Sequence, residues 1–375
     1  MTYLSHRVSI AMNAGLLVSL VRLAPADAGP DRLYVTNSSL RERADDANIA
    51  RFDIAASGAI AQVDTADASE GGRGIVFTPA VRGRRFAYAP SELANSIDFY
   101  RVDRSGRLTL AGSTETPQPF GIAIAPDGST VYVPSLTGSL SAFHVTSSGK
   151  LKPLNTVDTG QTIAKGVAVT SSGRFIYVTH SPEEDGGVGA VTGFELRSNG
   201  SIGRQVANVP AGPSGHRAII TPDDRFLYIT NQVAESGPDV AGFRIDASGE
   251  LTPVPGSPFE GGVWTEGTAL SPDGTKLFIT ALGAVGDETV RDGQVRGFSI
   301  GADGRLVEIE RVDIGSDPVD LAFGRDGAHL YVSDFSDDTV TIFHADTAGN
   351  LDRVDTVPSG GVEPGFQSVV VLPGS

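Results

Sequence analysis

Short runs of β-branched and aromatic residues recur along the chain, separated by polar and glycine-rich segments. Leu33-Tyr34-Val35-Thr36 and Ile176-Tyr177-Val178-Thr179 are two examples. Runs of this length and composition between turn residues predict β-strands. The copies centre on Tyr34, Tyr88, Tyr132, Tyr177, Tyr228, Phe278 and Tyr331, at intervals of 44 (Tyr88 to Tyr132) to 54 residues (Tyr34 to Tyr88). Seven copies at this spacing predict a repeat protein.

A second pattern runs in step with the first, and in it an aromatic residue is followed six positions later by glycine. Glycine supplies the positive φ of a hairpin turn, and the apolar residue after it begins the next strand. The pairs are Phe52 and Gly58, Tyr100 and Gly106, Phe143 and Gly149, Phe194 and Gly200, Phe243 and Gly249, Phe298 and Gly304, and Phe343 and Gly349.

A third element precedes most copies of the first. It is a run of small residues that ends in a Pro-Asp-Gly turn, as at Pro126-Asp127-Gly128 and Pro272-Asp273-Gly274. Small residues suit an innermost strand, where neighbouring sheets crowd together. Each repeat therefore predicts four short antiparallel strands, which must pack on the next repeat because a lone sheet buries too little.

The two ends of the chain complement each other. The segment from Asp31 to Thr36 is a second strand without an inner strand, and Gln367 to Leu372 is an inner strand without a second strand. We therefore predict an all-β fold over residues 29–375. It is a seven-bladed β-propeller of four-stranded antiparallel blades, closed by N- and C-terminal strands that share one blade.

Residues 1–28 do not follow the repeat. Arg7 is followed by a mostly apolar stretch from Val8 to Leu20, and Ala26-Asp27-Ala28 places small residues at the positions a signal peptidase reads. We expect a signal peptide over 1–28 and an exported protein, periplasmic or secreted. If the segment is instead an N-terminal extension, the protein is cytoplasmic.

Composition narrows the possible partners. A net charge of −16 argues against nucleic acid, because phosphate neutralisation needs clustered Lys and Arg. No apolar run reaches the roughly 18 residues of a membrane span, so we expect no membrane insertion. With no cysteine, disulfides, thiolate metal sites and cysteine nucleophiles are excluded. We expect a monomer that acts on a small molecule without a cofactor.

The repeat resembles the lactonase branch of seven-bladed propellers, which includes 6-phosphogluconolactonase and carboxymuconate cyclase. The resemblance rests on the Pro-Asp-Gly turn, the strand motif at Tyr34 to Asn37 and Tyr228 to Asn231, and the aromatic-x5-Gly-x-Leu hairpin. It covers Asp31 to Leu372 and implies a hydrolase that opens a lactone of a small polar acid. The chain departs from the family where histidine-bearing motifs are expected. Ala164-Lys165-Gly166 and Gly215-His216-Arg217 stand there, and Gln232 stands in place of a Glu.

Topology predicts which polar residues share one face. The segment before each inner strand and the loop after each second strand lie at the same end of a propeller, around the central channel. A polar funnel at this end is a candidate ligand pocket. Its residues are Arg73, Gln118, Lys165, His216, Arg217, Glu266, Asp320 and Gln367 before inner strands, and Asn37, Glu92, His180, Asn231, Gln232 and Asp334 after second strands.

Lactone opening needs a base for water and positive charge for the carbonyl oxygen. His216 is the first candidate base and His180 the second, and Glu266 would orient the histidine or act as base itself. Arg217 would stabilise the oxyanion, as would Arg73 and Lys165, which also bind substrate. The other predicted substrate-binding residues are Gln118, Asn231, Gln232, Asp334 and Gln367.

Other interpretations stay open at the sequence level. The chain could be a non-catalytic propeller that binds a ligand or protein, or a cyclase or isomerase. Acidic runs at Asp334, Asp337 and Asp338, and at 183–185, could hold a structural calcium. We place His144, His329 and His344 on the surface. The connections from Tyr34 to Phe52, Tyr177 to Phe194 and Phe278 to Phe298 are long, and we expect them to wall the funnel.

Overall fold

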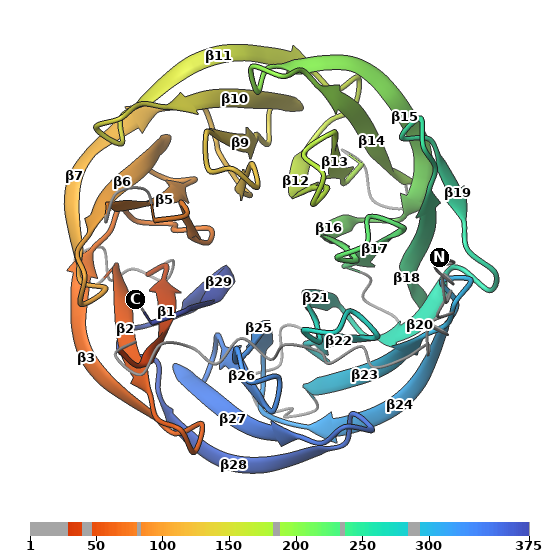
Figure 1. Cartoon of the computed structure of the whole chain (residues 1–375). Helices are drawn as coiled ribbons and strands as arrows, with labels where there is room; N and C mark the ends of the chain where they lie inside the picture. The colour runs from red at the N-terminus through yellow and green to blue at the C-terminus, as the bar shows by residue number, and fades with distance from the viewer. Residues whose placement is uncertain are drawn as a thin grey trace, which may run out of the picture.

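Seven antiparallel sheets stand in a ring around a central channel in the computed structural model (Figure 1). The structure describes residues 29–39, 47–80, 84–182, 188–232, 237–283 and 293–374. Within these ranges no helix is long and apolar enough to span a membrane. The predicted seven-bladed propeller is confirmed. The predicted signal segment, 1–28, and the centres of the three long connections lie outside the described residues.

The strands of each blade run from the channel outward. The innermost strands are β29 (Pro364–Leu372), β4 (Val76–Phe77), β8 (Ala123–Ile124), β12 (Ala164–Val169), β16 (Gly215–Ile220), β21 (Thr265–Leu270) and β25 (Pro318–Phe323), for blades 1 to 7 in that order. The second strands are β1 (Asp31–Asn37), β5 (Arg85–Ser91), β9 (Thr130–Pro134), β13 (Phe175–His180), β17 (Phe226–Asn231), β22 (Lys276–Ala281) and β26 (His329–Asp334).

Two further layers complete the blades. The third strands are β2 (Asn48–Ile54), β6 (Ser96–Val102), β10 (Ser139–Val145), β14 (Gly189–Leu196), β18 (Gly237–Ile245), β23 (Gln294–Ile300) and β27 (Thr339–Ala345). The outer strands are β3 (Ile60–Asp67), β7 (Leu108–Glu115), β11 (Leu151–Asp158), β15 (Ile202–Gly212), β24 (Leu306–Asp313) and β28 (Leu351–Pro358). Blade 5 departs from the predicted four strands, because its outer edge is split into β19 (Leu251–Pro253) and β20 (Phe259–Gly262). Pro253, Pro255 and Pro258 lie at this break and cannot donate to a ladder.

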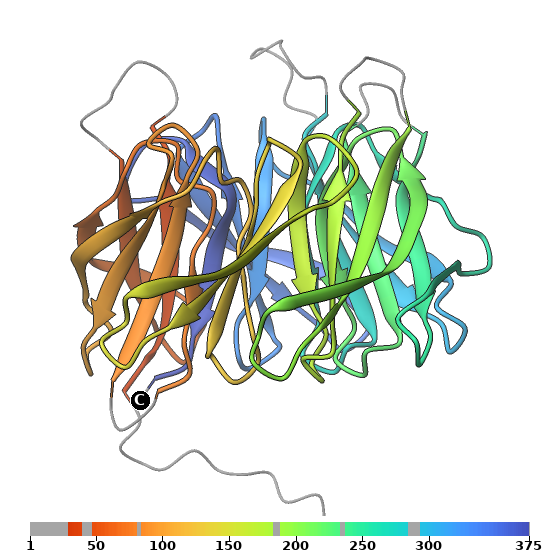
Figure 2. The ribbon, with the colours of Figure 1, turned by 90° about the horizontal axis from the view of Figure 1, so that it is seen from above.

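The ring closes where the first and the last strand pair. β29 pairs with β1, with Val370 opposite Tyr34 and Leu372 opposite Arg32, and the two lie side by side in Figure 1. The shared blade predicted from the sequence is therefore confirmed. Figure 2 shows the ring from the side, with the strands crossing it from one face to the other.

The hairpin glycines act both within their own blade and between blades. Each of the seven has a φ between +79° (Gly58) and +100° (Gly349), which L side chains rarely adopt. Each also packs against the preceding blade. A Cβ at Gly304, for example, would lie 2.5 Å from the ring of Phe226. The sequence-predicted turn therefore also sets how closely two blades approach.

The second-strand tyrosines join the blades through the carbonyls of these glycines. Tyr88 donates a 2.7 Å hydrogen bond to Gly149 of the next blade, and Tyr331 of blade 7 donates a 3.0 Å bond to Gly58 of blade 1. Tyr34, Tyr132, Tyr177 and Tyr228 make the same contact. Phe278 stands at the equivalent position in blade 6. Six of the seven blade junctions therefore share the same tyrosine-to-glycine hydrogen bond.

We expect Tyr331→Phe to lower the free energy of unfolding by about 1–2 kcal/mol, because it leaves the carbonyl of Gly58 without its donor. Tyr88→Phe, which acts at an internal junction, is the matched comparison. In a closed ring no blade junction is terminal, so none should open more easily than the others. We therefore expect the two variants to lose similar amounts of unfolding free energy, measured by urea denaturation. A Tyr331→Phe protein as stable as the parent would show that this bond does not support closure.

One histidine lies where it was not expected. The prediction that His329 is a surface residue is wrong. It is buried, its Nδ1 lies 2.6 Å from Asp326 Oδ2, and its ring packs against that of His344. The reason is the close approach of blade 1, because the Gly58 hairpin covers this imidazole.

Candidate functional site

The inner strands of blades 4, 5 and 6 each carry a β-bulge near their start. The register shifts between Ala164 and Val167 in β12, between Gly215 and Ala218 in β16, and between Thr265 and Thr268 in β21. The residues inside the bulges include Lys165, His216 and Glu266. A bulge interrupts strand alternation and re-aims a side chain. It therefore brings these three polar residues together at one end of the channel.

Threonines of the second strands fix the bulges. The Thr179 hydroxyl accepts a 2.8 Å hydrogen bond from Gly166 N and donates a 3.0 Å bond to the carbonyl of His216. Thr230 donates a 2.7 Å bond to the carbonyl of Glu266. A Cβ at Gly166 would overlap the His216 carbonyl oxygen, so only glycine fits there. The strand motif thus positions site residues on the neighbouring blade.

His216 and Glu266 form a buried pair. His216 Nδ1 lies 2.6 Å from Glu266 Oε2, and the two side chains are 2 % and 0 % exposed. The other carboxylate oxygen accepts hydrogen bonds from Gln232 Nε2 and, at 3.0 Å, from the indole of Trp264. Gln232 in turn accepts a 2.8 Å bond from Lys165 Nζ. The carboxylate is therefore held from three sides, and the imidazole is fixed by it.

Phe120 joins this pair to two cations. Its ring meets His216 edge to face, with centroids 5.6 Å apart. The Arg73 guanidinium lies 4.6 Å and the Lys165 ammonium 5.9 Å from the Phe120 centroid. Arg73 also donates a 2.9 Å bond from Nε to Glu92. We call these residues the mouth cluster: Arg73, Glu92, Phe120, Lys165, His216, Gln232, Trp264 and Glu266.

Burial sets the charge state of the cluster. It lowers the pKa of His216, an effect that Glu266 partly opposes. It also lowers the pKa of Lys165, again against the influence of Glu266. His216 is therefore neutral near pH 7, with its proton on Nδ1 facing the carboxylate and a lone pair on Nε2. The charges of Arg73 and Lys165 balance those of Glu92 and Glu266.

The remaining predicted site residues lie outside the cluster. Arg217 Nη2 lies 3.6 Å from Asp320 Oδ1, and Gln367 is buried at the channel wall. His180 lies at the end of β13, opposite Ala164, and burial lowers its pKa to about 4. Gln118 is exposed.

Two predicted binding residues bond to nearby backbone groups instead of joining the cluster. Asn231 Nδ2 donates to the carbonyls of Ala211 and Asp239 at 2.9 and 3.0 Å. Asp334 accepts a 2.9 Å bond from Asp337 N, and burial raises its pKa to about 6. In the described part of the chain no group of three His, Cys, Asp or Glu is placed to hold a metal ion, Asp334, Asp337 and Asp338 included. The other acidic run, 183–185, lies outside it.

Sequence reasoning missed two members of the cluster. Phe120 precedes Gly121 as Lys165 precedes Gly166, so aligning the inner strands would have assigned Phe120 rather than Gln118 to the ring of site residues. Trp264 is two residues before Glu266 and has a φ of +57°. The one signal in the sequence was that Trp264 is the single tryptophan of the chain.

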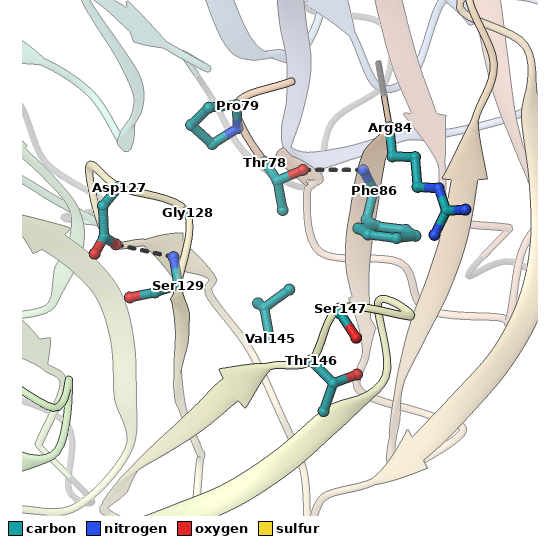
Figure 3. Close-up of a pocket in the computed structure, with 10 residues that line it drawn as sticks. All are labelled: Thr78, Pro79, Arg84, Phe86, Asp127, Gly128, Ser129, Val145, Thr146 and Ser147. Carbon is teal, nitrogen blue, oxygen red and sulfur yellow. Dashed lines mark hydrogen bonds between the residues drawn. The ribbon is translucent and has the colours of Figure 1, made fainter. Parts of the chain in front are cut away.

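A cavity of about 600 Å³ lies between blades 2 and 3 (Figure 3). It is lined by the turn that follows the inner strand, so it opens at the end of the blades opposite the mouth cluster. Its carboxylate, Asp127, accepts a hydrogen bond from Ser129 N in its own turn, and Thr78 accepts one from Phe86 N. No histidine lines it. This cavity therefore contains none of the residues of the mouth cluster.

The structure is thus a closed seven-bladed propeller with a buried His–Glu pair at one end of its channel. The family model described as Lactonase, 7-bladed beta-propeller matches residues 44–212 and 184–364. The chain belongs to this family, as the resemblance predicted.

Individual relatives agree with the family. The chain is 25 % identical over 183 residues to the carboxy-cis,cis-muconate cyclase of Neurospora crassa, covering 42 % of this chain and 49 % of the relative. It is 32 % identical over 139 residues to a 6-phosphogluconolactonase of Pectobacterium carotovorum, covering 33 % and 41 %. The chain thus spans less than half the length of these curated relatives. The solved periplasmic gluconolactonase of Pseudomonas aeruginosa superposes with a TM-score of 0.69 at 19 % identity, covering 92 % of this chain and 99 % of that chain.

Proposed function

We propose that this protein hydrolyses a lactone at the mouth cluster. His216 Nε2 takes a proton from water as the water oxygen attacks the ring carbonyl, while Glu266 keeps the imidazole oriented and supports its positive charge. Lys165 and Arg73 stabilise the negative oxygen of the tetrahedral intermediate. The carbonyl re-forms as the ring C–O bond breaks, and the imidazolium returns its proton to the leaving oxygen. The product is a hydroxy acid.

The observation that carries this proposal is the buried His216–Glu266 pair beside two cations. A neutral imidazole held by a carboxylate has the arrangement expected of a general base. The names of the relatives, 6-phosphogluconolactonase and gluconolactonase, point to the same reaction class.

The balanced charge of the cluster bears on the substrate. Arg73 is paired with Glu92, and Lys165 is bonded to Gln232 close to Glu266, so no surplus of positive charge remains for a phosphate. An uncharged lactone fits this electrostatics better than a phosphorylated one. We therefore expect glucono-δ-lactone to be opened faster than its 6-phosphate.

The test is proton release from a panel of sugar, alkyl, aromatic and acyl-amino lactones, read with a pH indicator. Hydrolysis above the spontaneous rate supports the proposal. A folded protein that opens none of them but binds one in calorimetry would be a binding propeller. Ring closure of an unsaturated diacid without lactone opening would make it a cyclase.

We also propose that the protein is exported and acts as a monomer. The basic, apolar and small-residue pattern of residues 1–28 supports export, and the P. aeruginosa neighbour is described as periplasmic. Cell fractionation with N-terminal sequencing should find a mature chain that begins at Gly29. Light scattering of that chain should give the monomer mass.

A further inference from the structure

The central channel contains a cavity of about 390 Å³. Its walls come from the inner strands and are largely aliphatic. They include Ile75, Val76, Phe77, Ile122, Ile124, Val167, Ala218, Ile219, Val370 and Leu372, and the polar members are Arg217, Thr268 and Gln367. Volumes of roughly 300–1,000 Å³, apolar walls and a few polar groups are typical of small-molecule sites.

Two of these polar side chains have buried atoms without a partner. Gln367 is 8 % and Thr268 3 % exposed. Gln367 Nε2 and Thr268 Oγ1 make no hydrogen bond to any residue that the structure describes. Buried polar atoms are normally satisfied, so atoms like these mark a place for a ligand or ordered water.

The polar end of the channel adjoins the mouth cluster. Arg217 directly follows His216, and Gln367 Oε1 lies 3.5 Å from the position that a Cβ on Gly121, the neighbour of Phe120, would take. Phe77, Ile124 and Leu372 stand at the far ends of their strands. The channel therefore runs from a hydrogen-bonding zone beside the cluster to an apolar zone near the opposite face.

We propose that the channel binds the substituent of the lactone, and that the substrate is a lactone ring carrying a hydrogen-bonding linkage followed by an apolar chain. This inference rests on the proposed function, since the mouth cluster holds the ring. An acceptor oxygen in the linkage takes the hydrogen of Gln367 Nε2 or the Thr268 hydroxyl. The chain lies along Ile122 and Val167.

The first test varies chain length. We expect kcat/KM to rise about fourfold per methylene from γ-butyrolactone through γ-hexalactone to γ-octalactone, because each methylene leaves water for an aliphatic wall. The increase should stop when the channel is full. Hydrolysis with equal or falling kcat/KM along the series would overturn the inference while leaving the proposed function standing.

The second test changes the channel. Val167→Phe narrows it and should abolish the gain with chain length. Val169→Phe, two positions along the same strand and packed on the same core cluster, is the matched control and should keep the gain. If kcat/KM rises with chain length in both variants as it does in the parent, the inference is overturned.

The third test does not depend on turnover. The corresponding alkyl lactams should bind with an affinity that rises with chain length in the parent and not in Val167→Phe, measured by calorimetry. If lactams bind in this way but no lactone is opened, the channel site stands and the proposed hydrolysis fails. If no lactam binds, the channel holds only water and the inference fails.

The hydrogen-bonding zone has its own variant. Gln367→Leu removes the amide donor at similar volume. It should lower kcat/KM for N-acyl-homoserine lactones, which carry an amide linkage, about fivefold more than for γ-alkyl lactones of the same chain length, which carry none. An equal change for both substrates would argue against a linkage contact at Gln367.

Discussion

Replacing His216 with asparagine should lower kcat for lactone opening by about 10²- to 10⁴-fold, the usual contribution of a general base. Asparagine can still donate to Glu266 but cannot accept a proton from water. KM should change much less, because the loss falls on the transition state rather than on the bound lactone. Initial rates over a range of lactone concentrations separate the two constants.

The control for this variant is His144→Asn, since His144 is exposed on β10 and far from the channel. It should retain the parent kcat. Fluorescence of Trp264, the single tryptophan, reports whether the site is intact, because its indole donates to Glu266. A His216→Asn protein with native fluorescence and undiminished kcat would rule out His216 as the base.

Glu266→Gln should lower kcat by about two orders of magnitude, because the imidazole loses the carboxylate that orients it and stabilises its charged form. The pH profile should move in a defined direction. The neutral base is active, so activity falls as pH drops through the pKa of His216, which burial already places below its usual value near 6.5. Glu266 opposes that lowering, so its removal should shift the acid limb to still lower pH.

This combination of effects distinguishes orientation from protonation. At pH 7 the fraction of neutral His216 does not decrease in Glu266→Gln, so the loss of kcat must come from geometry and from the less stable imidazolium. Initial rates of lactone opening, measured by quenching the reaction at fixed times from pH 4.5 to 8, would give kcat and the position of the acid limb. An acid limb displaced to higher pH would contradict the assigned pairing, and Glu92→Gln, which changes the partner of Arg73 instead, should leave the limb near its parent position.

The fold was predictable because its signals are local and repeated. Hairpin glycines, Pro-Asp-Gly turns and second-strand motifs each depend on a few neighbouring residues, and seven copies reinforce one another. The half-blades at the two ends predicted the closure that β29 and β1 make. The split outer edge of blade 5 was not predicted, although its three prolines carried the signal.

The site was predictable only to the level of a face. Topology placed His216, Glu266, Lys165 and Arg73 at one end of the channel, and they do meet there. It placed Asn231 and Asp334 at the same end, where they bond to nearby backbone groups instead. The alternation of inward and outward side chains along a strand does not predict whether a polar residue at the strand's end will join the mouth cluster or bond to nearby backbone.

The sequence by itself determined the number of blades, the order of their strands and the way the ring closes, since these follow from turn chemistry and strand periodicity. The tertiary structure alone decided which polar side chains meet. His216 contacts Phe120, which lies two blades away, and a bulge in β21 turns Glu266 toward His216. Both depend on how closely the inner strands pack around the axis, a distance that no local stretch of sequence encodes.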